Sequence, residues 1–351
     1  MSDLNKDGAM DTTGVDAAAS VMTSNDGLSG RVDRRTFLSA LAATLPAGIV
    51  RSEIQESAIP IIDTHIHLFD QTRPQGAPYA GGRPPGSTAP TLPSYPPRYR
   101  ALARPLGIVG AIAVEASPWV EDNLWLLQVA QTDTLVVGVI GNLEPDKPEF
   151  GEYLDRYRKN SLFLGIRYGN LWGRDLTKQT ENAAFLAGVT RLADAGLVFE
   201  TANPRIALLE AIVRLTDKVP DVRVVLDHMP GLIPAAGEQM AHERLLAELG
   251  KRPRIFCKLS SVVRRIDGEV SFDVAAYRDR LDRLVETFGD DRVIFGSDWP
   301  NSDSVAPPDQ IIAVVKQYVA GKPAAFQEKY FWRNSIPAYR WVRRAPDQPQ
   351  S

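Results

Sequence analysis

The 351-residue chain has 44% hydrophobic and 24% charged residues, a composition typical of a globular protein with a full apolar core. Its net charge of −3 and pI near 5.9 give no overall attraction to nucleic acid or to anionic lipid, so nucleic acid is not expected as a partner. The single cysteine, Cys257, excludes an intrachain disulfide, and its apolar neighbours indicate a buried, unreactive thiol.

Residues 1–55 differ in composition from the rest of the chain. Residues 1–29 are rich in Ser, Asp, Gly and Ala and show no apolar periodicity, which predicts disorder. Arg34 and Arg35 then precede a modest apolar stretch, a pattern that resembles a twin-arginine export signal. This stretch is too short for stable insertion in a membrane. We therefore expect a twin-arginine translocase to export the folded protein to the periplasm. If the segment is only a short amphipathic helix, the protein is cytoplasmic.

From residue 56 to about residue 345, short apolar runs rich in β-branched residues alternate with longer helical stretches, which predicts parallel strands joined by helical crossovers. Eight such units in a region of this length predict a single-domain (β/α)8 TIM barrel. A doubly wound open sheet is the alternative, but it would concentrate its site near one crevice. The expected strands are Ile61–Asp63, Ile108–Val114, Leu135–Ile140, Phe163–Arg167, Leu197–Glu200, Arg223–Leu226, Arg254–Lys258 and Arg292–Phe295.

Polar side chains lie at the carboxyl ends of most of these expected strands. In a closed barrel the strand ends form one ring, so residues more than two hundred positions apart can face a common cavity. This convergence predicts an enzyme active site. The residues concerned are His65 and His67 after the first strand, Glu115, Arg167, Asp227 and His228, Lys258 and Ser260, and finally Asp298 after the eighth.

The His-x-His pair of His65 and His67 is the most informative of these features. Alternate side chains of a strand point to the same face, so the two imidazoles can hold one metal ion or one substrate group. The chain has only four histidines, so two at this spacing are unlikely to arise by chance.

Several motifs resemble the amidohydrolase superfamily and, within it, the amidohydrolase-2 branch, which includes lactone hydrolases and decarboxylases. The resemblance extends from Ile61 to about Tyr339 and implies a TIM-barrel enzyme acting on a small molecule. The matching segments are Asp63–His67 (Asp-Thr-His-Ile-His), Leu226–His228 (Leu-Asp-His), Lys258–Ser260 (Lys-Leu-Ser), Phe295–Pro300 (Phe-Gly-Ser-Asp-Trp-Pro) and Phe331–Asn334 (Phe-Trp-Arg-Asn).

The chain departs from the two-metal members of that superfamily, which have a bridging group after the fourth strand. Arg167 stands there instead, and its guanidinium would repel a second cation, so one metal or none is expected. With one divalent ion, zinc in the first place, His65, His67, His228 and Asp298 would be its ligands. Without a metal, which we favour, Asp298 would act as general base while the histidines and Arg167 stabilise the oxyanion.

Two sets of residues bear on the substrate. Arg167 and Lys258 predict a ligand that is anionic or rich in carbonyl groups, although Lys258 could equally be a buried counter-ion of Asp298. The Pro- and Gly-rich segment Gln71–Pro105 is expected to be a long loop over the catalytic face. Its candidate substrate contacts are Tyr79, Tyr95, Arg98 and Tyr99.

The leading hypothesis is a hydrolase that opens a small, carboxylated or sugar-derived lactone by attack of water on the ring ester. The second is a decarboxylase of a small unsaturated or aromatic acid, which would need a firmly bound metal. The third is a catalytically inactive periplasmic barrel that only binds its ligand. The sequence does not predict an oligomeric state.

Overall fold

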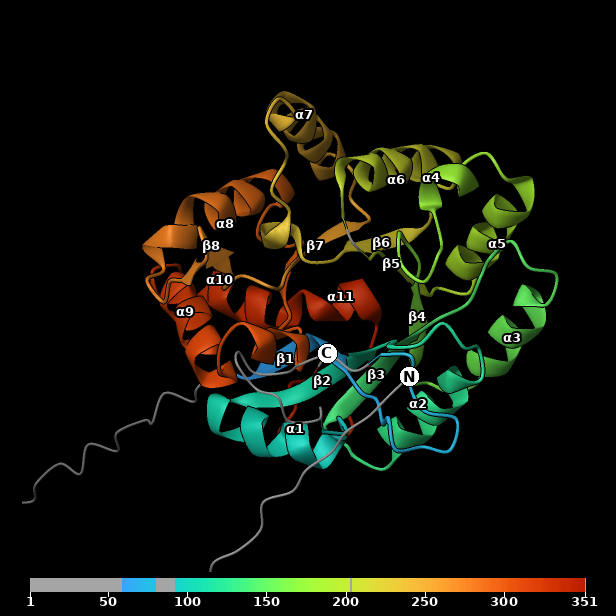
Figure 1. Cartoon of the computed structure of the whole chain (residues 1–351), viewed down its shortest axis with the longest axis horizontal. Helices are drawn as coiled ribbons and strands as arrows, with labels where there is room; N and C mark the ends of the chain where they lie inside the picture. The colour runs from blue at the N-terminus through green and yellow to red at the C-terminus, as the bar shows by residue number, and fades with distance from the viewer. Residues whose placement is uncertain (1–58, 80–91, 203, 351) are drawn as a thin grey trace, which may run out of the picture. The chain divides into compact units, whose positions relative to one another are not determined.

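The computed structural model describes residues 59–79, 92–202 and 204–350. Eight parallel strands form one sheet in which each strand pairs with the next along the chain (Figure 1). The first and last strands meet at a bridge between Ile66 and Trp299, where His67 N donates to Trp299 O at 2.7 Å. The ring is therefore nearly closed, which confirms the TIM barrel and excludes the open sheet. The strands are β1 (Ile61–His67), β2 (Ile108–Val114), β3 (Val136–Gly141), β4 (Phe163–Arg167), β5 (Val198–Glu200), β6 (Arg223–Leu226), β7 (Ile255–Leu259) and β10 (Val293–Phe295).

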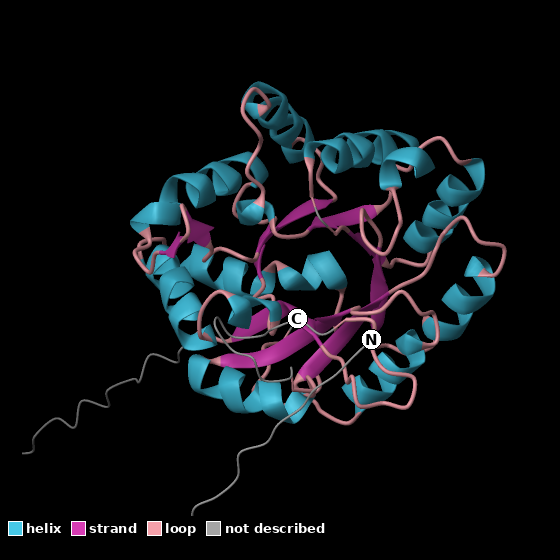
Figure 2. Cartoon of the chain, in the orientation of Figure 1, coloured by secondary structure: helices cyan, strands magenta, loops and turns pink. Residues whose placement is uncertain are grey.

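Most helices surround this ring of strands on the outside, whereas α11 (Ser335–Tyr339) lies across the opening of the ring in this view (Figure 2). Among the residues that the structure describes, none of them combines the length and apolar character needed to cross a membrane. The α-helices are α1 (Pro96–Ala103), α2 (Asp122–Gln131), α3 (Phe150–Tyr157), α4 (Leu176–Gln179), α5 (Ala183–Asp194), α6 (Ile206–Lys218), α7 (Gln239–Gly250), α8 (Ala275–Phe288), α9 (Pro308–Ala320), α10 (Ala324–Glu328) and α11 (Ser335–Tyr339). The shorter helices are η1 (Arg104–Leu106), η2 (Met229–Gly231), η3 (Asn301–Ser304) and η4 (Lys329–Arg333).

The inside of the barrel is filled with apolar side chains at the end where the strands begin. Branched and aromatic residues from successive strands form this inner core, and Tyr339 and Trp341 pack against it from the C-terminal part of the chain. Asn334 Nδ2 donates to Val293 O at 2.8 Å, at the start of β10, which ties the same part of the chain to the beginning of a strand. Because this end is filled, the site must lie at the carboxyl ends of the strands.

Two segments differ from the sequence-based expectation. The segment Gln71–Pro105 is not one long loop, because α1 and the start of η1 lie within it; α1 begins with Pro96, which suits the first helical position. A small antiparallel hairpin of β8 (Arg265–Ile266) and β9 (Glu269–Val270) follows β7 and was not expected. The twin-arginine-like segment and residues 80–91 lie outside the described residues.

Candidate active site

A cavity of about 270 Å³ opens at the carboxyl ends of the strands. Of the site residues predicted from the sequence, it brings together His67, Tyr79, Arg167, His228 and Asp298. Its lining consists of His67, Tyr79, Glu115, Ala116, Arg167, Leu171, Trp172, Ala202, His228, Asp298 and Asn301. We call this cavity the catalytic pocket.

An irregularity in β1 brings both histidines of the His-x-His pair to the inside of the barrel. The pairing of β1 with β2 shifts between Asp63 and Ile66. Ile66, which separates His65 and His67 in the sequence, packs into the outer core. The Asp63 carboxylate accepts hydrogen bonds from His65 N at 3.0 Å and from Ser297 N at 2.8 Å. Asp63 therefore fixes the backbone that carries His65 and His67 against the end of β10.

The imidazoles form a hydrogen-bonded chain that starts at Lys258. Lys258 Nζ donates to His65 Nδ1 at 3.0 Å, so the proton of neutral His65 is on Nε2. His65 Nε2 lies 3.1 Å from His67 Nε2 and can donate to it. His67 then carries its proton on Nδ1, which donates to Val114 O at 3.1 Å. Burial, followed by the charge of Lys258, lowers the pKa of His65 well below its usual value, in agreement with a neutral ring.

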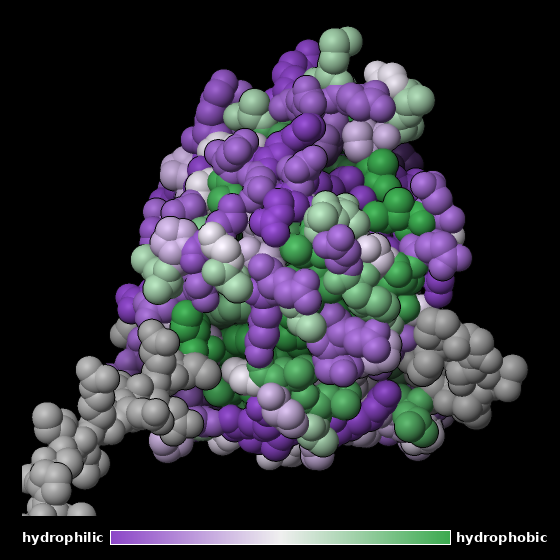
Figure 3. All heavy atoms as spheres, turned by 90° about the vertical axis from the view of Figure 1, so that its left-hand side faces the viewer, coloured by the Kyte–Doolittle hydropathy of each residue, from purple (hydrophilic) through white to green (hydrophobic). Residues whose placement is uncertain are grey.

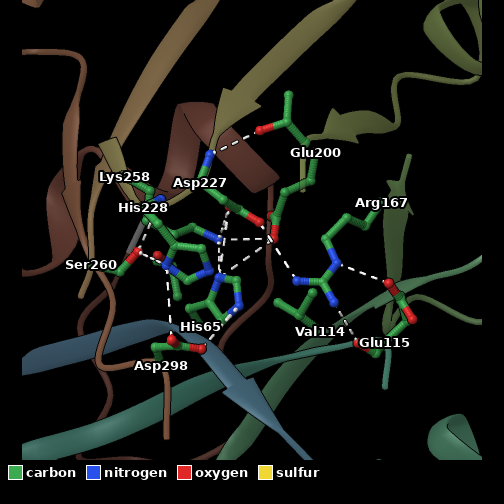
Figure 4. A network of polar contacts seen from close by, with 12 residues as sticks. His65, Val114, Glu115, Arg167, Glu200, Asp227, His228, Lys258, Ser260 and Asp298 are labelled. Atoms are coloured by element: carbon green, nitrogen blue, oxygen red, sulfur yellow. Dashed lines mark hydrogen bonds and ion pairs between the residues drawn. The ribbon is translucent and has the colours of Figure 1, made fainter. Parts of the chain in front are cut away.

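Lys258 lies beneath the catalytic pocket rather than in its lining. Its side chain is fully buried, and Nζ lies 2.9 Å from Glu200 Oε1 and 3.0 Å from Asp227 Oδ1 (Figure 4). Burial, together with the neighbouring Asp227 charge, raises the pKa of Glu200 to about 7. The prediction that Lys258 contacts substrate is therefore wrong, and so is the alternative that it is the counter-ion of Asp298. It pairs with Glu200 and Asp227 and holds His65 in place. We call Lys258, Glu200, Asp227 and His65 the floor.

Asp298 lies where the floor meets the pocket. Its Oδ1 is 3.5 Å from His67 Nε2 and 3.7 Å from His65 Nε2, which confirms the convergence expected from the sequence. Ser261 Oγ donates to Oδ2 at 3.0 Å, and Asn301 Nδ2 donates to Oδ1 at 3.0 Å. Burial alone would raise the pKa of Asp298, but the nearby imidazoles, His228 first, hold it well below its usual range. The carboxylate is therefore ionised at neutral pH.

His228 lies beside Asp298, with its Nδ1 4.0 Å from Asp298 Oδ2. Ser260 Oγ lies 2.8 Å from His228 Nδ1, and Ser261 Oγ lies 3.2 Å from the same nitrogen. When Ser260 donates there, the imidazole carries its proton on Nε2, which bonds to no described residue. Burial lowers the pKa of His228, so the ring is neutral. A neutral imidazole in this position can donate a hydrogen bond to a substrate oxygen.

Arg167 lines the pocket, but its guanidinium already has protein partners. Its Nε donates to Glu115 Oε1 at 2.9 Å and its Nη2 to Glu115 O at 2.9 Å. The other carboxylate oxygen of Glu115 accepts from Trp172 Nε1 at 3.0 Å. The charge of Arg167 is thus largely balanced before any ligand binds. We call Glu115, Arg167 and Trp172, together with Tyr79, the wall of the pocket.

The other tyrosines and the arginine expected to contact substrate do not line the pocket. Tyr99 is only 3% exposed, and its hydroxyl donates to Asp63 Oδ2 beneath β1. The Tyr95 hydroxyl donates to Asp70 Oδ2 at 2.8 Å. Arg98 Nη2 lies 3.8 Å from Asp303 Oδ2. The prediction for Tyr99 is therefore corrected to a structural role, because its hydroxyl supports the carboxylate that holds His65.

Glu115 lies directly after β2 and lines the pocket, as its position at a strand end predicted. Trp172 and Asn301 also line the pocket, although the sequence did not point to them. Trp172 and Asn301 lie in connecting segments after β4 and β10, where no spacing rule applies.

The donor atoms around Asp298 fit one divalent ion. One ring nitrogen each of His65 and His228 and one carboxylate oxygen of Asp298 all lie within 4.8 Å of one another. Imidazole nitrogens and a carboxylate oxygen are the ligands zinc uses in catalytic sites. A second such group, His65 with Glu200 and Asp227, already surrounds the Lys258 ammonium. The carboxylates of this second group therefore already have a cation supplied by the protein itself.

The chain is similar to known lactone hydrolases over most of its length. A family model described as amidohydrolase (Amidohydro_2) matches residues 62–341, well over half of the chain. The L-fucono-1,5-lactonase of Burkholderia multivorans is 25% identical over 289 residues, which are 77% of this chain and 92% of that protein. The 4-sulfomuconolactone hydrolase of Rhizobium radiobacter is 26% identical over 254 residues, which are 70% of this chain and 77% of that protein.

Solved structures show the same fold. A zinc-bound amidohydrolase from Burkholderia multivorans superimposes with a TM-score of 0.69 at 22% identity, covering 81% of this chain and all of that one. A 5-carboxyvanillate decarboxylase from Sphingomonas paucimobilis gives a TM-score of 0.54 at 14% identity, covering 81% of this chain and all of that one. Together with the family match over residues 62–341, these findings show that the chain belongs to the amidohydrolase family of hydrolases.

Proposed function

We propose that the protein opens a small neutral lactone, of the kind derived from a sugar, by attack of water on the ring ester. The observation that carries this proposal is an ionised Asp298 whose carboxylate oxygens lie 3.5 to 4.0 Å from nitrogens of His65, His67 and His228. The one arginine of the described pocket lining is already paired with Glu115. A carboxylate that stays ionised at neutral pH, beside an imidazole that can donate a hydrogen bond, suits the hydrolysis of an ester.

In the proposed reaction, Asp298 accepts a proton from water as the water oxygen bonds to the ring carbonyl carbon. The negative charge moves to the carbonyl oxygen, where His228 Nε2 donates a hydrogen bond to it. The ring C–O bond then breaks, and the proton held by Asp298 passes to the departing alkoxide oxygen. The product is an open-chain hydroxy acid, and Asp298 is ionised again. Lys258 keeps His65 oriented beside Asp298 throughout.

A single divalent ion held by His65, His228 and Asp298 would supply a more acidic bound water. We nevertheless expect turnover to survive removal of metals, because Lys258, His65, His67 and Val114 already satisfy one another's hydrogen bonds. Elemental analysis of the purified protein, followed by dialysis against a strong chelator, tests this. Loss of turnover that zinc restores would contradict it.

The charge of the pocket favours a neutral lactone over a carboxylated one. The described lining has one cationic side chain, Arg167, against the two carboxylates Glu115 and Asp298. A carboxylate on the substrate would meet this excess of negative charge. The hydroxyls of a sugar lactone can instead bond to Glu115 and Asn301 while its ring packs against Trp172.

The experiment is continuous titration at constant pH with a panel of lactones. We expect base uptake with neutral lactones such as D-glucono-1,5-lactone, and at least tenfold lower kcat/KM with carboxylated ones such as muconolactone. Release of carbon dioxide from aromatic or unsaturated acids would favour the decarboxylase. Tight binding with no turnover would favour the inactive binding barrel. Either result would overturn the proposal.

We further propose that Arg34 and Arg35 direct export of the folded protein to the periplasm. The support is the motif alone, followed by a short apolar stretch. The test is fractionation of cells that express the native chain or a chain with Arg34→Lys and Arg35→Lys. Equal amounts of both chains in the periplasm would contradict the proposal.

A further inference from the structure

A second cavity lies between α7 and α8, outside the catalytic pocket. Its volume is about 290 Å³, similar to the pocket's 270 Å³, and the two cavities share no lining residue. Met229, which directly follows His228, belongs to this lining. The charged or titratable side chains that line the cavity are His242, Glu243, Arg264, Asp279, Arg280 and Arg283. We call this cavity the arginine cavity. The surface around α7, at the top of Figure 3, is mostly hydrophilic.

The charges that line the arginine cavity do not cancel. Arg283 Nη1 lies 3.0 Å from Glu243 Oε1, so these two balance each other. Arg264 donates through Nη1 to the backbone oxygen of Pro230, which carries no formal charge. Arg280 makes no hydrogen bond or ion pair with a described residue, and Asp279 is the only other carboxylate. Three guanidinium groups therefore face two carboxylates, and Arg280 lacks a counter-ion.

The electrostatics of Arg280 agree with this lack of a partner. Burial, followed by the charges of Arg264 and Arg283, lowers the pKa of Arg280 to about 10. The group remains protonated at neutral pH, but it is held next to like charges without compensation. An anion placed between Arg264 and Arg280 would relieve this repulsion and restore the lost solvation.

Buried nitrogens in the same lining also lack partners. Nε of Arg264 and Nε2 of His242 are inaccessible to solvent and bond to no described residue. His242 is only 8% exposed, although it lies on the outer helix α7. Buried polar atoms normally have hydrogen-bond partners, because leaving them unpaired costs free energy. The cavity thus combines free space, unbalanced positive charge and unsatisfied nitrogens.

We propose that the arginine cavity binds a small molecule through a carboxylate or phosphate group, with Arg280 and Arg264 as its main contacts. The planar guanidinium group matches both kinds of oxyanion. Ala275 and Ala276, in the first turn of the 14-residue helix α8, also line the cavity, but their amides already donate to Asp273, so the guanidinium groups supply the contacts. The volume of the cavity suits a ligand of a few carbon atoms rather than a polymer.

Two sources could supply such an anion. One is phosphate, free or carried by a small molecule. The other is a hydroxy acid of the kind that lactone hydrolysis releases, and only this second source rests on the proposed function. The test uses inorganic phosphate and D-gluconate as separate probes, so the proposal of an anion site can succeed even if the proposed reaction is wrong.

The experiment is isothermal titration of the full chain with each probe, at constant ionic strength maintained with chloride. We expect saturable binding of at least one probe, and at least tenfold weaker binding to Arg280→Gln. Arg265→Gln is the matched control, because Arg265 is exposed on β8 next to Arg264 and its loss removes the same charge. Binding to this control should be unchanged.

Absence of saturable binding by either probe would overturn the proposal. So would equal weakening in Arg280→Gln and Arg265→Gln, which would indicate non-specific attraction, or full binding in Arg280→Gln, which would place the probe elsewhere. Thermal unfolding of each variant reports on folding. If Arg280→Gln is markedly less stable than the native chain, Arg280→Lys replaces it and should weaken binding severalfold, because an ammonium lacks the two-pronged geometry.

Discussion

The floor and the wall of the catalytic pocket contain similar charged groups, but these groups are held in different ways. In the floor, one Lys258 ammonium contacts Glu200, Asp227 and His65, and the side chains of all four are fully buried. In the wall, Arg167 and Glu115 pair with each other at the edge of a cavity open to ligand. Loss of Lys258 would leave two buried carboxylates without their cation, whereas a change in the wall alters what the ligand meets.

This difference separates two kinds of effect. The floor fixes the orientation and proton position of His65, so changes there act on folding and on kcat together. The wall presents Trp172 and Tyr79 to the ligand, so changes there act mainly on KM. Asp298 lies between the two regions, and its substitution tests whether the reaction takes place where they meet.

Asp298→Asn should have the largest effect on rate. The amide keeps the shape of the side chain but cannot accept a proton from water, so we expect kcat to fall about 10³-fold. Lactone hydrolysis at constant pH measures this fall, and thermal unfolding shows whether the variant is folded. A folded variant that retains more than a tenth of the native kcat would show that another group is the base.

Lys258→Met should have the largest effect on stability. The thioether removes the charge and leaves Glu200 and Asp227 as neighbouring buried carboxylates, which should cost about 3 kcal/mol of unfolding free energy. Chemical denaturation measures this loss. Lys316→Met is the matched control, because Lys316 is on α9 and donates only to the backbone oxygen of Leu106. A similar loss in both variants would mean that Lys258 has no special role.

The contrast between floor and wall also explains how far the sequence could predict the site. The positions of His65, His67, His228 and Asp298 follow from strand ends in a closed barrel, and the structure brings them together as expected. The role of Lys258 could not be predicted in this way. It depends on which side chains meet across the barrel interior, and that depends on strand registers that are not visible in a single sequence.

The same limit applies to the fold. Ile108–Val114, Phe163–Arg167 and Arg223–Leu226 match the expected strands residue for residue, because each is a short apolar run with clear ends. β1 was expected to end at Asp63 but continues to His67, because its last residues are polar and yet fully within the barrel. Hydrophobicity alone therefore marks the beginning of β1 but not its end.

Trp172→Phe should have a moderate effect that is confined to the wall. Phenylalanine keeps an aromatic surface but removes the Nε1 hydrogen bond to Glu115, so we expect KM to rise about tenfold while kcat changes less than about threefold. Steady-state kinetics with the best lactone separates the two constants. Trp119→Phe, on an exposed segment outside the pocket, should leave both unchanged. A fall in kcat alone for Trp172→Phe would contradict the division between floor and wall.

Asp303→Asn should have the smallest effect and appear only as a dependence of stability on pH. Asp303 lies in η3, and burial, opposed by the charge of Arg98, raises the pKa of its carboxyl to about 6. Because this pKa lies above the ordinary value of 3.8, the carboxyl stabilises the fold at low pH and loses that contribution as pH rises to 6.

The native chain should therefore lose about 1 kcal/mol of unfolding free energy relative to Asp303→Asn between pH 4 and pH 7, after allowance for partial solvent screening. Denaturant unfolding at several pH values measures this difference. Asp309→Asn, at an exposed position on α9, should show no comparable trend. Parallel curves for the native chain and Asp303→Asn would show that Arg98 alone neutralises the carboxylate. It would follow that a single acidic side chain outside the floor, such as Asp303, can be neutralised by an arginine and does not require a buried ammonium group like that of Lys258.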